Sequence, residues 1–165
     1  MVFNGISSVL SFLTIIPTKS YDITFIAQNM HLFPLIGLII GLAIGILSFF
    51  LFSIFEGFLL GFIITAVIIG ITGLHHSDAL ADLADGLMVK GSFEFKHKVM
   101  SDPRNGTAGT VVLIFYIIGM IILVTSIEDK SKLISVIIIA EVLSRYSMVL
   151  QCYLGKSAWK GMNSI

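Results

Sequence analysis

The sequence predicts an all-α fold: a polytopic transmembrane bundle of about four spanning helices, a short N-terminal interfacial helix and a cytoplasmic acidic helix and loop. Two observations predict this class. Of the 165 residues, 56% are hydrophobic and 12% are charged, and the mean hydropathy is +1.02, whereas soluble domains carry about 25% charged residues. The apolar residues also form uninterrupted stretches that, at about 1.5 Å per residue, can cross a hydrocarbon layer of about 30 Å.

Four apolar stretches are expected to cross the membrane within one membrane domain that covers residues 1–165. Their bounds are about 32–55, 57–74, 107–127 and 133–154. Met1–Ile16 is shorter and is interrupted by polar residues, so we expect an interfacial or re-entrant helix that ends at Pro17. The last stretch contains Glu141 and Arg145, whose spacing of four residues lets them pair on one helix face.

Basic residues fall unevenly on the two sides of the predicted bundle. If the four stretches alternate in direction, one side receives Lys19, Lys90, Lys96, Lys98, Arg104, Lys156 and Lys160, and the other receives Lys130 and Lys132. Lysine and arginine collect on the cytoplasmic side, so residues 75–106 are expected there. The formal net charge is zero, which leaves no basic surplus for nucleic acid as a partner. The single cysteine, Cys152, excludes an internal disulfide.

Three aspartates share one face of the helix expected in this cytoplasmic segment. Asp78, Asp82 and Asp85 stand at i, i+4 and i+7, within a narrow arc at about 100° per residue. Carboxylates about 6 Å apart repel by roughly 3 kcal/mol at an effective dielectric constant of about 20, which favours a cation between them. Oxygen ligands without cysteine favour Mg²⁺ or Mn²⁺ over zinc. The alternative is an ordinary solvated acidic face.

The other residues of this helix have structural interpretations. Ser77 is the expected N-cap, because its hydroxyl can accept a bond from a free backbone amide. Small side chains permit close packing of the helix against a neighbour; they are Ala79, Ala81 and Ala84. The opposite face is expected to carry Leu80, Leu83 and Leu87.

The segment that follows offers groups that bind phosphate. Asp102 and Arg104 lie in the turn SDPRNGTAG, whose Gly106 and Gly109 precede the third span. Arginine presents a planar set of donors, and glycine-rich backbone at a helix start exposes amides to an anion. We predict that Arg104 and this turn bind phosphate, whereas topology or lipid headgroups account for the nearby lysines. His76 is a candidate metal ligand, proton shuttle or phosphate partner.

These motifs resemble those of the cobalamin synthase family, the adenosylcobinamide-GDP ribazoletransferases. The resemblance rests on HSDALADLADG followed by VMSDPRNGTAG, and on FLTIIP, FPLIGLIIG and AEVLSRYSMVL in the family's order. The chain departs from the family pattern at Ala79, where glycine is usual, and at Ile15, where arginine is frequent. Family members usually run about half as long again, so the resemblance implies a chain that lacks the C-terminal part.

The resemblance implies a function at the cell membrane of a prokaryote. The phospho-cobinamide group would pass from adenosylcobinamide-GDP to α-ribazole or α-ribazole 5'-phosphate, with release of GMP. Candidate partners besides these substrates are the lipid bilayer, a second copy of the chain and membrane proteins of the corrinoid pathway.

The resemblance and the residue chemistry together give the predicted site. The metal ligands, for magnesium or manganese, are Asp78, Asp82 and Asp85. The catalytic residues are Asp82, Asp85 and Arg104, with Arg104 stabilising developing charge and one aspartate serving as general base. The substrate-binding residues are His76, Asp102, Arg104, Gly106 and Arg145; the last is included because charges inside membrane spans are functional candidates.

Three other functions fit parts of the sequence. DLADG contains the D-x-x-D-G opening of the CDP-alcohol phosphotransferases that make phospholipids, although the chain lacks their following A-R and their paired downstream aspartates. A cation carrier would use the acids to bind an ion in transit, but its acids should lie within spans. A non-catalytic membrane scaffold would tolerate Asp82→Asn without loss of any activity.

Overall fold

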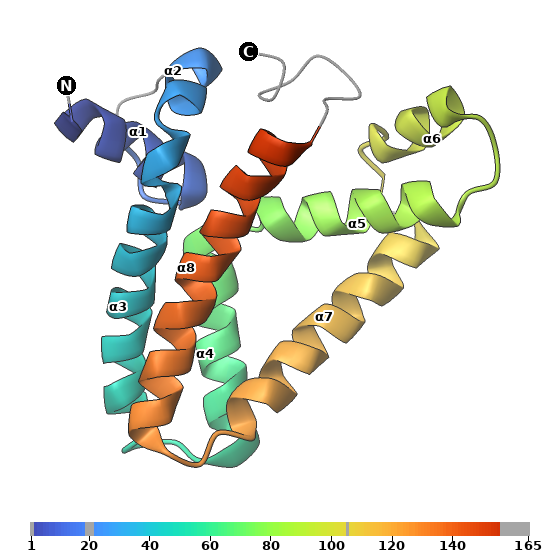
Figure 1. The fold of residues 1–165 in the computed structure, drawn as a ribbon. Helices are drawn as coiled ribbons and strands as arrows, with labels where there is room; N and C mark the ends of the chain where they lie inside the picture. The colour runs from blue at the N-terminus through green and yellow to red at the C-terminus, as the bar shows by residue number, and fades with distance from the viewer. Residues whose placement is uncertain (1, 19–21, 105, 156–165) are drawn as a thin grey trace. The chain divides into compact units, whose positions relative to one another are not determined.

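The structure, a computed structural model, describes residues 2–18, 22–104 and 106–155. Over these residues it contains helices and no strand (Figure 1), so the predicted all-α class is confirmed. The chain forms two compact units: one is residues 57–126, and the other joins residues 1–56 to residues 127–165. Each unit has its own packing.

The first unit is built around two long apolar helices. Its elements are α1 (Val2–Leu13), α2 (Ile23–Gln28), the 3-10 turn η1 (Met30–Leu32), α3 (Phe33–Leu51) and α8 (Lys130–Leu154). The N-terminal helix α1 ends at Leu13, before the expected end at Pro17. The chain turns there because the Thr14 hydroxyl donates to the carbonyl of Leu10 at 2.6 Å and accepts from the amide of Ile16 at 3.2 Å.

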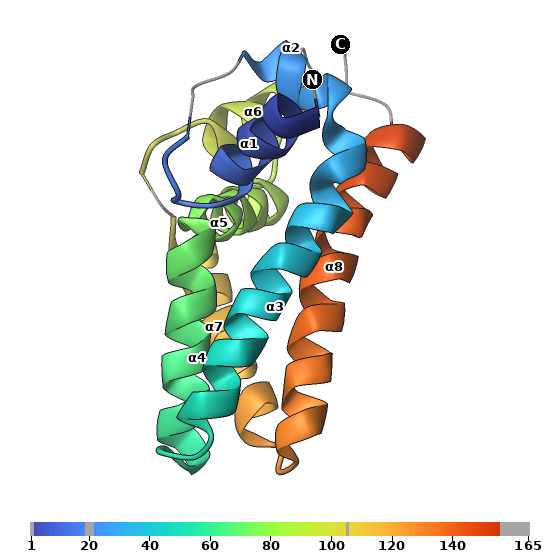
Figure 2. The same ribbon diagram turned by 90° about the vertical axis from the view of Figure 1, so that its left-hand side faces the viewer.

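A stripe of glycines lets α3 and α8 lie side by side (Figure 2). Gly37, Gly41 and Gly45 recur every four residues and are buried. A Cβ atom at Gly37 would lie 2.6 Å from the carbonyl oxygen of Glu141, and one at Gly41 would lie 2.9 Å from Cα of Ile138. Between helices in a membrane the hydrophobic effect is absent, so close backbone approach of this kind drives association.

The ion pair predicted within the last span is confirmed. Arg145 Nη1 contacts Glu141 Oε2, and the two residues are 4% and 6% exposed. They continue a buried stripe of α8 that begins with Leu133 and Ile137. Because a buried charge without its partner is strongly unfavourable, each residue of this pair depends on the other.

In the second unit three helices form the sides of a triangle, with α6 beside one side (Figure 1). The elements are α4 (Gly57–Thr72), α5 (His75–Met88), α6 (Phe93–Met100) and α7 (Thr107–Thr125). The N-terminal end of α4 and the C-terminal end of α7 meet at Gly61, where a Cβ atom would lie 2.7 Å from the carbonyl oxygen of Ile121. Gly61 therefore allows the two backbones to touch.

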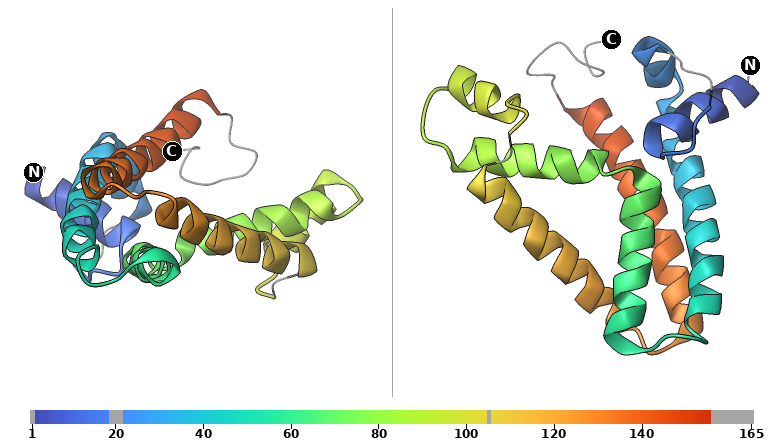
Figure 3. Two further views of the ribbon diagram at one scale, coloured as in Figure 1. Left: turned by 90° about the horizontal axis from the view of Figure 1, so that it is seen from below. Right: turned by 180° about the vertical axis from the view of Figure 1, so that it is seen from behind.

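The corner between α4 and α5 is a sharp turn that the sequence did not predict (Figure 3, right). The two helices are bent by 91°, and Gly73 and Leu74 have φ angles of 71° and 62°. Leu74 stands at the N-cap position of α5, so the prediction that Ser77 is the N-cap is wrong. The left-handed conformation of Leu74 is unfavourable for a residue with a Cβ atom, and the turn redirects the chain before Ser77 is reached.

The predicted number of about four spans agrees with the helices found. Three helical segments of the described chain are long and apolar enough to cross a membrane: Met30–Leu51, Thr107–Thr125 and Lys130–Leu154. A fourth is counted if the bent pair of α4 and α5 forms one span. With 16 residues, α4 alone falls short of a straight crossing of about 30 Å.

Small residues form the packed face of α5. Its buried residues are Ala81, Ala84, Asp85 and Gly86, which agrees with the expected packing role of Ala81 and Ala84. Ala79 is exposed, so the expectation that it packs against a neighbour is wrong. Leu83 and Leu87, on another part of the helix surface, are 45% and 66% exposed. The helix therefore approaches α7 through its alanines and leaves these leucines available to lipid or to other apolar groups.

Candidate active site

The three predicted metal ligands have different surroundings although they share one helix. Asp78 is exposed, Asp82 is half-buried and Asp85 is 8% exposed. Burial, and then the charges of Asp78 and Asp85, raise the pKa of Asp82 above its ordinary value. The acids are thus close enough to repel one another. Within the described chain, however, no three His, Cys, Asp or Glu side chains are gathered closely enough to hold a metal ion.

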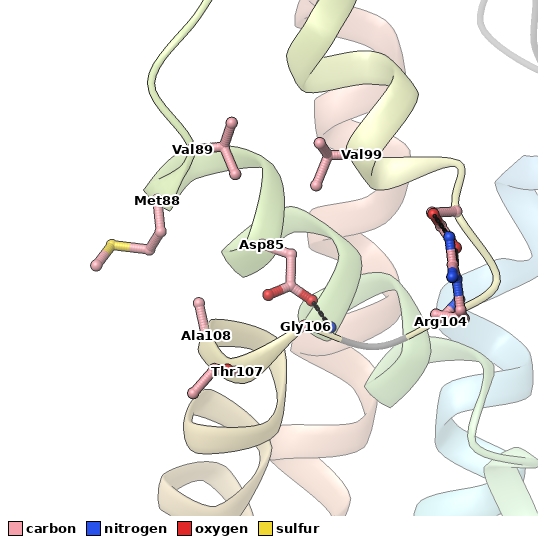
Figure 4. A pocket seen from close by; sticks show the side chains of 9 residues that line it. Asp85, Met88, Val89, Val99, Arg104, Gly106, Thr107 and Ala108 are labelled. Atoms are coloured by element: carbon pink, nitrogen blue, oxygen red, sulfur yellow. Dashed lines mark hydrogen bonds and ion pairs between the residues drawn. The ribbon is translucent and has the colours of Figure 1, made fainter.

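The Asp85 carboxylate points onto the start of α7 (Figure 4). The amide of Gly106 donates to Asp85 Oδ2 at 2.7 Å, and the amide of Gly109 donates to Oδ1 at 2.9 Å. The first amides of a helix have no partner within the helix, and they carry the positive end of its dipole. Asp85 therefore stabilises the start of α7, because its negative charge faces the positive end of the helix dipole and its two oxygens accept the free amides. The amide of Gly106, predicted to bind substrate, is engaged by this carboxylate.

Asp102 and Arg104 form an exposed ion pair in the turn between α6 and α7. Arg104 Nε and Nη2 each donate to the Asp102 carboxylate at 3.1 Å, and the Arg104 amide donates to Oδ1 at 3.0 Å. The guanidinium, by hydrogen bonding to Asp102, holds the pKa of that carboxyl below its ordinary value. The Arg104 side chain is 87% exposed, so the remaining N–H groups of its guanidinium can meet an anion.

A cavity of about 320 Å³ joins these two features. Its polar lining includes four residues that the sequence predicted as site residues: Asp85, Asp102, Arg104 and Gly106. Asp78, Asp82 and His76 are not among the lining residues. His76 lies exposed in the first turn of α5, and Arg145 belongs to the first unit.

The cavity also has an apolar wall that was not predicted from the sequence. This wall is formed by Met88, Val89, Val99 and Ala108 (Figure 4). Val99 reaches the cavity because residues 93–100 form the helix α6, which Ser92 caps by accepting a bond from the amide of Phe95 at 3.3 Å. The sequence signal was present, since serine before a short run with acid in its first turn favours a helix start.

Together the fold and the site define a class of protein. It is an all-α protein with helices apolar and long enough to cross a membrane, and its polar site lies on an acidic helix and at a neighbouring helix start. The chain belongs to the family whose model is described as Cobalamin-5-phosphate synthase, and that model matches residues 5–165.

Curated relatives support the same family. The chain is 35% identical to an adenosylcobinamide-GDP ribazoletransferase of Fusobacterium nucleatum over 162 residues, which are 90% of this chain and 57% of the relative. It is 32% identical to one of Archaeoglobus fulgidus over 164 residues, 98% of this chain and 65% of the relative. One of Methanocella arvoryzae is 26% identical, with 99% of this chain and 62% of the relative covered. The chain thus spans less than two thirds of these relatives, and no solved structure matches it.

Proposed function

We propose that this chain carries the active region for transfer of the phospho-cobinamide group from adenosylcobinamide-GDP to α-ribazole or α-ribazole 5'-phosphate. The observation that carries the proposal is the contact of Asp85 with Gly106 and Gly109. It joins the acidic helix to the Arg104 turn, the two segments on which the family resemblance chiefly rests. The cavity is polar on one side, which suits the diphosphate of adenosylcobinamide-GDP, and apolar on the other, which suits the base of the ribazole.

The reaction replaces the phosphoanhydride bond of the diphosphate with a phosphoester bond to the ribazole. A ribose hydroxyl oxygen of the ribazole bonds to the phosphorus next to the corrinoid arm, and the bond from that phosphorus to the bridging oxygen of the diphosphate breaks. GMP leaves with the electron pair of that bond, and the hydroxyl proton passes to an aspartate of α5 acting as general base. Arg104 donates N–H bonds to the phosphoryl oxygens as negative charge develops on them.

Magnesium, or manganese, is the proposed cofactor. The donors on α5 are hard carboxylate oxygens, which suit these cations, and the raised pKa of Asp82 beside Asp78 and Asp85 marks a place where a positive charge would relieve repulsion. The sequence predicts Asp78, Asp82 and Asp85 as ligands. When bound, such an ion neutralises diphosphate oxygens and orients the leaving group.

The remaining parts of the site receive roles in substrate binding. The wall of Met88, Val89 and Val99 would contact the planar base of the ribazole. His76 and Asp102 would orient substrate or partner side chains. That Arg145 binds substrate stays a prediction from the sequence. We further propose that the site faces the cytoplasm at the cell membrane, because the predicted topology places most basic residues on that side.

The test is turnover with two competing classes of substrate. Purified chain in lipid nanodiscs with Mg²⁺ receives adenosylcobinamide-GDP with α-ribazole, or a CDP-alcohol with an alcohol acceptor. We expect GMP release from the first pair and no CMP release from the second. We expect Asp82→Asn to abolish the GMP release. CMP release alone would reject the proposal in favour of a phospholipid synthase. A fusion that adds the remaining part of the Fusobacterium nucleatum relative tests whether the matched region suffices.

A further inference from the structure

The three corners of the second unit are held by different means, and only one depends on a charged side chain. The corner between α4 and α5 is a covalent turn at Gly73 and Leu74. The corner between α4 and α7 is a close backbone approach at Gly61. The corner between α5 and α7 is closed by the Asp85 carboxylate, which accepts two backbone amides.

The surroundings of Asp85 favour a carboxylate that stays hydrogen-bonded to the start of α7. It is 8% exposed, and a charge removed from water to this extent is costly unless it is hydrogen-bonded. Both of its oxygens meet amides at the positive end of a 19-residue helix. By contrast, Asp78 and Asp82 on the same helix are exposed and half-buried. The three acids are therefore divided into two outer carboxylates and one inner carboxylate.

The glycines of the turn are fitted to this carboxylate. A Cβ atom at Gly109 would lie 2.6 Å from Asp85 Oδ2 and 2.8 Å from the carbonyl oxygen of Ala81. The first of these atoms can move with its side chain, but the second belongs to the backbone of α5. Any residue larger than glycine at position 109 would therefore push α5 and α7 apart. The same contact surface thus requires both Asp85 and Gly109.

We infer that Asp85 is a positioning residue, which ties α5 to the start of α7 and thereby sets the Arg104 turn beside the acids, while the cation is left to Asp78 and Asp82. The inference rests on the proposed function for the identity of the cation and the substrate. It assigns Asp85 a role that differs from the one predicted for it from the sequence. The turn that carries Arg104 leads directly into the amides that Asp85 holds, so release of this contact would free the turn.

The first measurement follows the contact itself by hydrogen–deuterium exchange of the backbone at residues 106–110. Asp85→Asn keeps the size of the side chain and one acceptor oxygen, but it presents an N–H group to the second amide. We expect exchange in this segment to rise about tenfold or more, as for loss of a hydrogen bond to a charged group. Gly109→Ala, which alters no carboxylate, should produce the same rise. Asp78→Asn is the matched control and should leave exchange unchanged.

The second measurement follows the cation, with Mn²⁺ alone as the probe and electron paramagnetic resonance as the readout. Asp78→Asn and Asp82→Asn should each weaken Mn²⁺ binding about tenfold or more. Asp85→Asn and Gly109→Ala should bind Mn²⁺ within about twofold of the wild type, a difference of under 1 kcal/mol. In turnover, these two variants should raise the KM for adenosylcobinamide-GDP more than they lower kcat, whereas a mere loss of folded protein would lower kcat alone.

Two results would overturn the inference. One is an Asp85→Asn protein that loses Mn²⁺ binding as fully as Asp82→Asn does, because Asp85 would then be a ligand. The other is unchanged exchange at residues 106–110 in both Asp85→Asn and Gly109→Ala. If the wild type binds no Mn²⁺ and releases no GMP, the proposed function fails, while the exchange measurement still decides whether Asp85 holds the start of α7.

Discussion

Alanine in place of Gly37 tests the packing of α3 against α8. The added Cβ atom would lie 2.6 Å from the carbonyl oxygen of Glu141 and 3.1 Å from Cα of Val142, and neither backbone atom can rotate away. Ordinary contact begins near 3.4 Å, so the helices must separate by about 0.8 Å locally. Overpacking of this kind costs about 1–3 kcal/mol, and the higher helix propensity of alanine returns up to about 1 kcal/mol.

The matched control is Gly119→Ala in α7, where the added Cβ atom meets nothing within 4 Å. This variant gains the helix propensity of alanine without a clash. The difference between the free energies of unfolding of the two variants therefore gives the cost of the clash at position 37. We expect Gly37→Ala to be less stable than Gly119→Ala by about 1–3 kcal/mol. Unfolding in mixed detergent and SDS micelles, followed by circular dichroism, measures both. Free energies that agree within about 0.5 kcal/mol would refute the proposed close packing.

Three further predictions concern the site. Arg104→Ala should raise the KM for adenosylcobinamide-GDP about tenfold to a hundredfold, and Arg104→Lys less, in steady-state assays; an unchanged KM would exclude phosphate contact. Because burial and two neighbouring carboxylates raise the pKa of Asp82, its ionised form destabilises the metal-free fold. Asp82→Asn should therefore raise the melting temperature at pH 7 in EDTA, and this gain should disappear as the pH falls to 3.8, the ordinary pKa. Val99→Asp should raise the KM for α-ribazole more than that for adenosylcobinamide-GDP, and the reverse order would contradict the proposed apolar wall.

Features that depend on local periodicity could be predicted from the sequence. Long uncharged stretches give the spanning helices, and a spacing of four residues gives the Glu141–Arg145 pair, since both follow from the geometry of a single helix. The placement of aspartates on one helix was predicted on the same basis. The family resemblance was also readable, because it depends on the order of motifs in the chain.

Features that depend on a partner in space could not be predicted in the same way. The sequence predicts that Gly106 and Gly109 expose backbone amides to an anion, but in the structure their lack of a side chain lets the Asp85 carboxylate approach both of them and α5 approach Gly109. Only the structure reveals which carboxylate arrives there. The turn at Gly73 and Leu74 also could not be predicted from the local sequence. Leucine rarely adopts a positive φ, so nothing at position 74 indicates a sharp turn.

The glycine stripe of α3 is a signal that the sequence did contain. Gly37, Gly41 and Gly45 follow the small-residue spacing that favours close helix packing in membranes. Read alone, the stripe predicts a packed face but not the helix that covers it. The structure identifies that helix as α8, where the backbone at Glu141 meets Gly37, the backbone at Ile138 meets Gly41 and the side chain of Ile134 meets Gly45.

The central claim is that the acidic face of α5 and the Arg104 turn act as one site for a metal-bound diphosphate. Isothermal titration of the purified chain with guanosine diphosphate tests it most directly, once with Mg²⁺ and once with EDTA. The account predicts binding only with Mg²⁺, and loss of that binding in both Asp82→Asn and Arg104→Ala. Equal affinity in EDTA, or full binding by both variants, would contradict it.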